Sequence, residues 1–336
     1  MQSHPFRREV EAQFTGKMKG RKMNTIPAQF RRALRSGFGH GQMGMMNHQR
    51  MDHPLTEGEL REYAPSIFAE EAHVSRSARF TPVPTFSIVE GLRGHGFLPF
   101  AAKQSKSRDE DRLDYTKHLV RFRREGDGNG TYRNDDAIAE IVLVNANDGS
   151  SSYQLYGGMF RTLCLNGLIV ADSLIQSVRI GHTGNIIDKV IEGSYAVLEQ
   201  TQRALEVRDR WKALQLTAGE SQAFANAAHV LRFGEPENDK PSTPIQPHQL
   251  LGVRREEDRS NDLWTTFNRV QENAIRGGLT ARTKAGYVPD KESGRDVFKP
   301  SRKVQTREVR GIDQDVRLNK ALWVLAENLE GLKQAA

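Results

Sequence analysis

Four short strand-like segments, separated by turn-forming residues, constrain the fold of this chain more than any other feature. They span Phe97 to Gln104, His118 to Arg124, Ala139 to Val144 and Ser152 to Tyr156. The stretches SRDEDR, EGDGNG and NANDGS lie between them and are rich in Gly, Asp, Asn and Ser, which favour turns. Short connections of this kind join antiparallel strands. We therefore expect an antiparallel sheet, with two more strands within GLIVADS and IQSVRIG.

Helical periodicity covers much of the remaining chain. Asn185 and Asp188 have the spacing of a capping pair ahead of a long apolar stripe, and Thr56 and Ser260 stand at expected N-cap positions. Helices are expected to start at Thr56 and to cover about 185–214, 221–231, 260–277 and 313 onward. Together with the strands, they predict an α+β fold, an antiparallel sheet packed on one side by long helices.

The pattern divides the chain into three parts. Residues 1–54 are rich in Gly, His, Met, Gln and Arg without a sustained period, which predicts a basic flexible arm. Residues 55–235 hold the strands and the long helix and are expected to form an α+β core domain. Residues 236–336 are expected to be a helical C-terminal part packed on this core. It includes a basic loop or disordered insertion at 278–310.

The last expected helix carries a narrow stripe of leucines. They alternate at spacings of four and three residues: Leu318, Leu322, Leu325, Leu329 and Leu332. Such a stripe packs either onto its own domain or onto a second copy. A homo-oligomer is therefore a possible assembly.

Charge and composition limit the classes of partner. A net charge of +7 and a sequence pI near 9.5 favour a polyanion. No run of about 18 apolar residues is present, and the basic amino terminus lacks the apolar stretch of a signal peptide. The single cysteine excludes an intramolecular disulfide. We expect a cytoplasmic protein with no membrane partner.

Two groups of basic residues are the candidate nucleic-acid-binding residues. In KHLVRFRRE, apolar and basic residues alternate, so Lys117, Arg121 and Arg123 are expected on one strand face that is solvated or meets an anion. The second group lies between residues 254 and 310. It comprises Arg254, Arg255, Arg269, Arg276, Arg282, Lys284, Arg302, Lys303 and Arg307.

No motif of catalysis, metal binding or cofactor binding stands out. Cys164 is flanked by leucines and is expected in the core, because a nucleophilic cysteine needs a base and an electropositive setting. GHGQMG at 39–44 has the letters of a dinucleotide fingerprint but lacks the flanking strand and helix. The ten histidines show no helical zinc spacing. We expect no catalytic residue, no metal and no cofactor, and a protein that is not an enzyme.

Six stretches, in order from about Leu55 to Glu330, resemble one known family. They are LTEGELREYAPSIFAEEAHVSRSARFTPVPT, NANDGSSSYQ, FRTLCLNGLIV, GHTGNIIDKVIEGSYAVL, NDLWTTFNRVQENAIRGGL and GIDQDVRLNKALWVLAE. They are similar to the YafZ/YfjQ/YubP family, uncharacterised proteins encoded on prophages and conjugative plasmids. The family has no assigned activity, so the resemblance implies no site residues. It implies a protein of a mobile genetic element that acts near DNA transfer, replication or defence.

The charge pattern and this context favour a non-enzymatic DNA-binding protein. We expect it to bind single-stranded DNA for annealing or protection, because phosphate neutralisation gives affinity without sequence preference. A meander of strands followed by a long helix is also reminiscent of recombination annealing proteins. The alternative is an inhibitor of a host defence or replication protein that acts by protein–protein binding. A third hypothesis is an enzyme whose site is not visible in the sequence.

Overall fold

The centre of the fold is a seven-stranded sheet whose paired strands all run antiparallel. The computed structural model describes residues 48–49, 53–74, 83–107, 110–126, 137–162, 166–236, 241–289 and 294–335. The strand order is β1-β2-β3-β4-β5-β6, and β7 pairs with β5. The strands are β1 (His48–Gln49), β2 (Phe97–Gln104), β3 (His118–Arg124), β4 (Ala137–Asn145), β5 (Tyr153–Arg161), β6 (Asn166–Ile169) and β7 (Val178–Ile180).

The α+β class predicted from the sequence is confirmed, and so are several strand boundaries. Two predicted strands match β2 and β3 residue for residue. By contrast, β5 runs on to Arg161 because Gly157 and Gly158, which resemble a turn in the sequence, pair with β4. Most of the expected N-terminal arm, 1–54, lies outside the described residues, as does Cys164; within that stretch, His48–Gln49 form β1.

The described helices are α3 (Glu57–Tyr63), α4 (Thr85–Gly94), α5 (Ile186–Ala213), α6 (Ala218–Phe233), α7 (Leu263–Arg276) and α8 (Ile312–Ala335), with the 3-10 turns η1 (Pro65–Phe68), η2 (Glu110–Tyr115), η3 (Pro247–Leu251) and η4 (Glu256–Asp258). Four of the described helices, α3, α5, α6 and α7, begin at a residue whose side chain caps them. Thr56 forms the predicted capping box with Glu59, and the Asn185 side chain accepts a hydrogen bond from the amide of Asp188. The prediction that Ser260 caps α7 was wrong, because the N-cap is Asp262, whose side chain accepts a hydrogen bond from the amide of Thr265.

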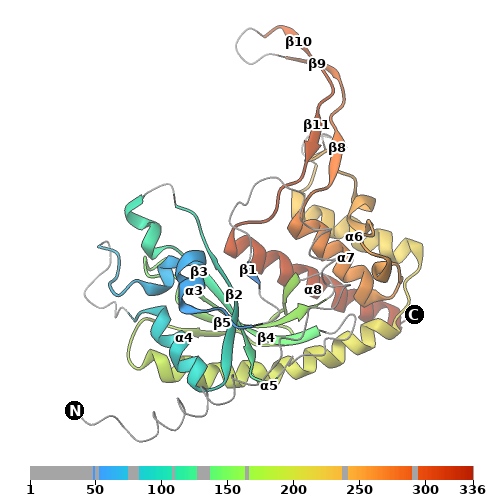
Figure 1. Cartoon of the computed structure of the whole chain (residues 1–336). Coiled ribbons are helices and arrows are strands. Elements are labelled where there is room, and N and C mark those ends of the chain that lie inside the picture. The colour runs from blue at the N-terminus through green and yellow to red at the C-terminus, as the bar shows by residue number, and fades with distance from the viewer. Residues whose placement is uncertain are drawn as a thin grey trace, which may run out of the picture. The chain divides into compact units, whose positions relative to one another are not determined.

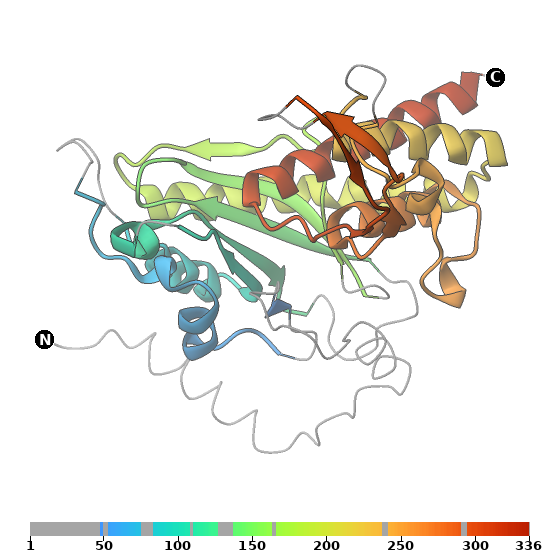
Figure 2. The same ribbon diagram turned by 90° about the horizontal axis from the view of Figure 1, so that it is seen from above.

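The long helix α5 covers one face of the sheet, as predicted. Figure 1 shows it beneath the strands, and Figure 2 shows it extending along them. Its buried side chains join those of β4 and β5 in the main hydrophobic cluster, which runs in sequence from Leu55 to Ala326. This cluster therefore contains residues of both the expected core domain and the expected C-terminal part. Burial of such surface is the main contribution to stability.

The opposite face of the sheet is also partly covered. Leu119, Val142 and Tyr156 point to this face and pack in a second, smaller cluster with Ile312 and Val316 from the first turns of α8. Lys117 lies at the same edge and its Nζ is 2.7 Å from Oδ1 of Asp313. The face that the sequence pattern marks as basic therefore meets the start of α8.

All three tryptophans of the chain meet where α5, α7 and α8 pack together. The ring of Trp211 lies 4.7 Å from that of Trp323 and 6.5 Å from that of Trp264, measured between ring centroids. Phe267 fills the space beside them, and Trp211 donates its indole hydrogen to Oε2 of Glu330 at 2.8 Å. Aromatic clusters of this kind bury large areas. The cluster joins the helix that covers the sheet to the C-terminal helices.

The leucine stripe of α8 packs mainly within its own chain. Leu318 and Leu322 are buried, and Leu325 and Leu329 are partly buried against the main cluster. Leu332 is 71% exposed. The first half of the stripe is therefore occupied by intramolecular packing.

A buried polar network lies at the end of the sheet near α4. Oγ of Ser66 is 2.9 Å from Nδ1 of His118, and Nε2 of His118 is 2.9 Å from Oγ1 of Thr85. Asn145 donates to the same Thr85 oxygen at 3.1 Å. All four side chains are completely buried. Burial lowers the pKa of His118 to about 4, so this histidine is neutral in the folded protein at neutral pH.

Acidification is expected to destabilise the fold through His118. Its pKa falls from the ordinary 6.5 to about 4 on folding, so between these values the unfolded chain binds a proton that the folded chain does not. Stability therefore decreases as pH falls through this window, by up to about 3 kcal/mol. Urea unfolding of wild type and His118→Gln across the window checks this. We expect the difference in the free energy of unfolding between wild type and His118→Gln to shrink towards pH 4. If the stabilities of the two proteins changed in parallel with pH, His118 would not be the group responsible.

Candidate nucleic-acid interface

The basic stretch expected as a loop or disordered insertion at 278–310 instead contains four strands. They are β8 (Thr280–Arg282), β9 (Gly286–Pro289), β10 (Asp296–Lys299) and β11 (Lys303–Gln305). β8 pairs with β11 and β9 pairs with β10, both antiparallel. We call residues 279–307 the hairpin arm. Figure 1 shows β9 and β10 at its far end, beyond β8 and β11.

The two ladders of the hairpin arm share one register. Arg282 pairs with Lys303, and Gly286 pairs with Lys299. The two chain segments that connect the ladders therefore contain the same number of residues. Pro300, which has no amide hydrogen to donate, lies in the interruption. The arm is therefore a single hairpin.

The base of the hairpin arm is tied to the helical layer. Gly277 ends α7 with a φ of +68°, and a Cβ there would lie 2.7 Å from the carbonyl carbon of Arg307, so only glycine fits this turn. The carbonyl of Gly277 accepts a hydrogen bond from Arg254 at 2.6 Å. The side chain of Gln249 in turn donates to the carbonyl of Thr280 at 2.9 Å. These contacts fix where the arm leaves α7.

Exposed cations line the hairpin arm. The exposed basic side chains with described positions are Arg282, Lys284, Arg295, Lys299, Arg302, Lys303 and Arg307. Within the part of the chain that the structure describes, no carboxylate forms an ion pair with Arg282, Lys284, Arg302 or Lys303. Arg282 and Lys303 are register partners, so their side chains leave the same face of the ribbon. Cations arranged in this way are available to phosphate groups.

The strand face that carries Arg121 and Arg123, unlike the hairpin arm, is not available to phosphate groups. The sequence pattern left open whether it is solvated or meets an anion, and the structure shows the second: both guanidinium groups bind the carboxylate of Glu140, at 3.0 Å and 2.9 Å. Arg121 is 4% exposed and Arg123 is 1% exposed. Because they are buried, these two residues do not present a surface for DNA.

The sequence around Glu140 makes room for these guanidinium groups. A Cβ on Gly167 would lie 2.5 Å from Cζ of Arg121, so only glycine allows the arginine to cross β6 at this point. Arg121 also donates to the carbonyl oxygens of Gly167 and Leu168. Arg123 lies over the ring of Phe160, 4.0 Å from its centroid. The network is therefore a packed part of the fold.

Most of the C-terminal arginines before the arm serve the fold as well. Arg255 and Arg276 both bind Glu272, with Nη to Oε1 distances of 2.7 Å and 2.8 Å. Burial opposes ionisation of Glu272, but the hydrogen bond and charge of Arg255 hold the pKa of Glu272 below its ordinary value. Arg269 is buried and donates to Thr266 at 3.0 Å. These side chains brace η4 and α7.

The predicted site residues thus fall into two sets. Arg282, Lys284, Arg302, Lys303 and Arg307 come together on the exposed hairpin arm. The others lie elsewhere, in ion pairs or hydrogen bonds within the fold: Lys117, Arg121, Arg123, Arg254, Arg255, Arg269 and Arg276. Local sequence does not separate the two sets, because each contains basic residues interleaved with apolar ones.

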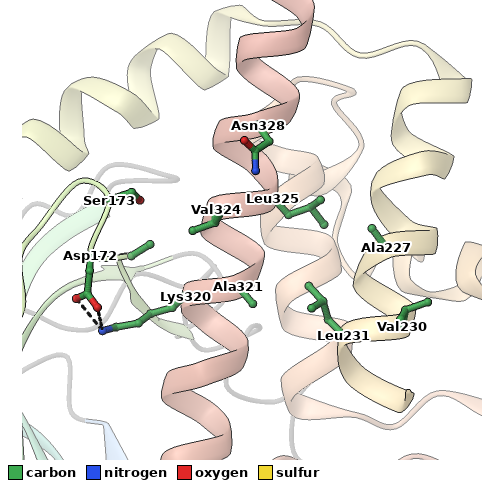
Figure 3. Close-up of a pocket in the computed structure, with 11 residues that line it drawn as sticks. Asp172, Ser173, Ala227, Val230, Leu231, Lys320, Ala321, Val324, Leu325 and Asn328 are labelled. Atoms are coloured by element: carbon green, nitrogen blue, oxygen red, sulfur yellow. Dashed lines mark hydrogen bonds and ion pairs between the residues drawn. The ribbon is translucent and has the colours of Figure 1, made fainter. Parts of the chain in front are cut away.

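An apolar groove of about 720 Å³ lies between α6 and α8 (Figure 3). Val230 and Leu231 of α6 face Val324 and Leu325 of α8 across it. At one rim, Nζ of Lys320 lies 2.8 Å from Asp172, and Figure 3 shows this ion pair directed away from the apolar lining. Although burial opposes it, the hydrogen bond from Lys320 keeps the pKa of Asp172 below its ordinary value. The groove is therefore mainly an apolar surface.

Among the described residues, Ser66 and His118 most resemble a nucleophile beside a base, and no sequence pattern predicts the pair. The two residues are 52 positions apart, so no local motif announces them. Both are completely buried and both ring nitrogens of His118 lie at hydrogen-bonding distance from hydroxyl groups. Substrate has no access to them, so we interpret the pair as structural.

Among the described residues, no group of three or more His, Cys, Asp or Glu side chains is arranged to hold a metal ion. In the same part of the chain, every helix is too short or too polar to cross a membrane.

Residues 72–323 match the family model described as Domain of unknown function (DUF932). The chain belongs to this family. It is 45% identical over 286 residues to the UPF0380 proteins YfjQ and YafZ of Escherichia coli (strain K12). Each alignment covers 85% of this chain and 95% of the relative, which confirms the family resemblance inferred from the six sequence stretches. No solved structure matches this DUF932 chain.

Proposed function

We propose that this protein is a non-enzymatic DNA-binding protein of a mobile genetic element, and that the hairpin arm is its DNA-binding element. The observation that carries the proposal is the set of exposed, unpaired cations at Arg282, Lys284, Arg302 and Lys303. The buried Arg121 binds a carboxylate within the fold, whereas among the described residues none of these four binds one; Arg282 donates instead to the hydroxyl of Ser301 at 3.2 Å. Phosphate groups of nucleic acid are suitable partners for such side chains.

Single-stranded DNA is the favoured ligand, and annealing or protection in the cytoplasm is the favoured role. A narrow two-stranded ribbon offers cations to a backbone without reading base edges, so we expect little sequence preference. A binding protein of this kind needs no catalytic residue. A homo-oligomer would place several hairpin arms along one strand of DNA.

Fluorescence anisotropy of a labelled single-stranded oligonucleotide, with a duplex in parallel, tests the proposal. If each of the four cations neutralises one phosphate, the logarithm of the binding constant for the single strand falls against the logarithm of salt concentration with a slope of about −3. We expect tighter binding to the single strand than to the duplex. Absence of binding at low salt would refute the proposal and would favour the alternative, an inhibitor of a host defence or replication protein.

A further inference from the structure

Two aromatic rings lie side by side at the far end of the hairpin arm. Tyr287 of β9 and Phe298 of β10 are register partners, and their ring centroids are 5.3 Å apart at an interplanar angle of 60°. Tyr287 is 72% exposed and Phe298 is 53% exposed. Two adjacent exposed rings form an apolar patch, which is more informative than a single exposed apolar side chain.

The neighbours of the two rings do not cover them. Ala285 and Pro300 flank the pair on the side towards the base of the arm, and both are exposed. Cross-strand aromatic contact stabilises a hairpin, but it leaves the outer faces of Tyr287 and Phe298 open. The pair therefore contributes a contact surface in addition to any support of the arm.

Cations lie near the open rings along the ribbon. Lys299 follows Phe298 directly, so its side chain leaves the opposite face of the ribbon, where its register partner Gly286 has no side chain to shield it. Lys284, three residues before Tyr287, is exposed in the segment between β8 and β9. Proteins that bind single-stranded nucleic acid combine these two components, cations for the backbone and aromatic rings on which bases stack.

We infer that Tyr287 and Phe298 form a stacking site for unpaired bases of a single-stranded nucleic acid whose phosphates contact the cations of the arm. This inference rests on the proposed function and names the chemistry of its ligand. Bases in a duplex are already stacked on one another and do not reach the rings. The aromatic pair therefore supplies the preference for single strands, while the cations bind both forms.

A double variant, Tyr287→Val with Phe298→Val, tests the inference on three labelled probes. The probes are an oligo-dT strand, an abasic strand of equal length that keeps the phosphates but lacks bases, and a duplex. Valine preserves strand propensity and a cross-strand apolar contact, so the hairpin is retained. We expect affinity for oligo-dT to fall by about tenfold or more, because each lost stacking contact costs at least about fivefold. Affinity for the other two probes should stay within about twofold.

The swap Tyr287→Phe with Phe298→Tyr is the matched control, since it exchanges the hydroxyl group but keeps both rings. It should bind oligo-dT like wild type. Equal losses by the valine variant on all three probes would overturn the stacking site, because they would mean that the rings only support the arm. Unchanged binding to oligo-dT would also overturn it. Failure of wild type to bind any probe would instead refute the proposed function, so the two failures are distinguishable.

Discussion

Reversing the charge of Arg282 and Lys303 together is expected to lower the affinity for single-stranded DNA on the order of a hundredfold at low salt. The two residues are register partners on the exposed hairpin arm, so the variant replaces two adjacent cations by two anions. Two phosphate contacts are lost and repulsion is added. The salt dependence should also become shallower by about 1.4 in slope, as two fewer counterions are displaced. Anisotropy titrations at several salt concentrations measure both effects.

Lys189→Glu with Arg203→Glu is the matched control for this variant. Both residues are exposed basic residues on α5, outside the hairpin arm, and the double reversal changes the net charge by the same amount. We expect less than about a threefold loss of affinity, since only the long-range field changes. Similar losses in the two double variants would mean that total charge governs binding, and would remove the special role of the arm. Both variants should retain wild-type thermal stability, because the altered side chains are exposed.

Glu140→Ala is expected to destabilise the fold by about 3–5 kcal/mol, the largest effect on stability that we predict. The Glu140 carboxylate binds Arg121 at 3.0 Å and Arg123 at 2.9 Å, and all three side chains are buried. Its removal leaves two guanidinium groups in the sheet without the anion that they share. Urea unfolding, followed by circular dichroism, measures the change in the free energy of unfolding.

A surface ion pair and a repacked variant serve as controls for Glu140. Glu57→Ala removes the exposed partner of Arg61, and we expect a loss of less than about 1 kcal/mol. Replacing Arg121 and Arg123 by Met together with Glu140→Leu should recover much of the lost stability, because no buried charge then remains unpaired. If Glu140→Ala behaved like Glu57→Ala, the two arginines would not depend on this carboxylate.

The Glu140 network also decides how binding should be tested. The sequence pattern marks Arg121 and Arg123 as candidates for contact with DNA, yet charge reversal at either residue would place two carboxylates side by side in the sheet. Such a variant would lose binding by unfolding. The arm residues avoid this problem because they are exposed.

The central sheet was predictable because its signals are local. The turn-forming sequences SRDEDR at 107–112 and EGDGNG at 125–130 stand on either side of β3, and the match to β2 and β3 follows from such boundaries. The capping box at Thr56 and the cap at Asn185 were predictable for the same reason, since each involves residues three positions apart. The cap of α7 was misplaced by two residues because Ser260 and Asp262 are both good caps, and only the observed helix start selects one.

The hairpin arm was missed because its strands are exposed on both faces. Strand prediction depends on one buried apolar face, and the side chains of β10 are all exposed. Its register partners lie seven or more residues apart, and Tyr287 and Phe298 are 11 apart, so no two-residue turn motif predicts the pairing. The alternation of GYVP and DVFK is too short to stand out among basic residues.

The sequence by itself determined the α+β class, the caps of α3 and α5, the extents of β2 and β3, and the number of basic residues, because propensity, short-range hydrogen bonds and composition need no distant partner. Only the tertiary structure decided which of the described cations form ion pairs within the fold. Arg121 and Arg282 have similar local surroundings in sequence, but the first meets Glu140, 19 positions away, while the second leaves the fold on a ribbon. The reason is physical: burial and ion pairing are set by chain segments that folding brings together, so a local pattern defines a face but not what covers it.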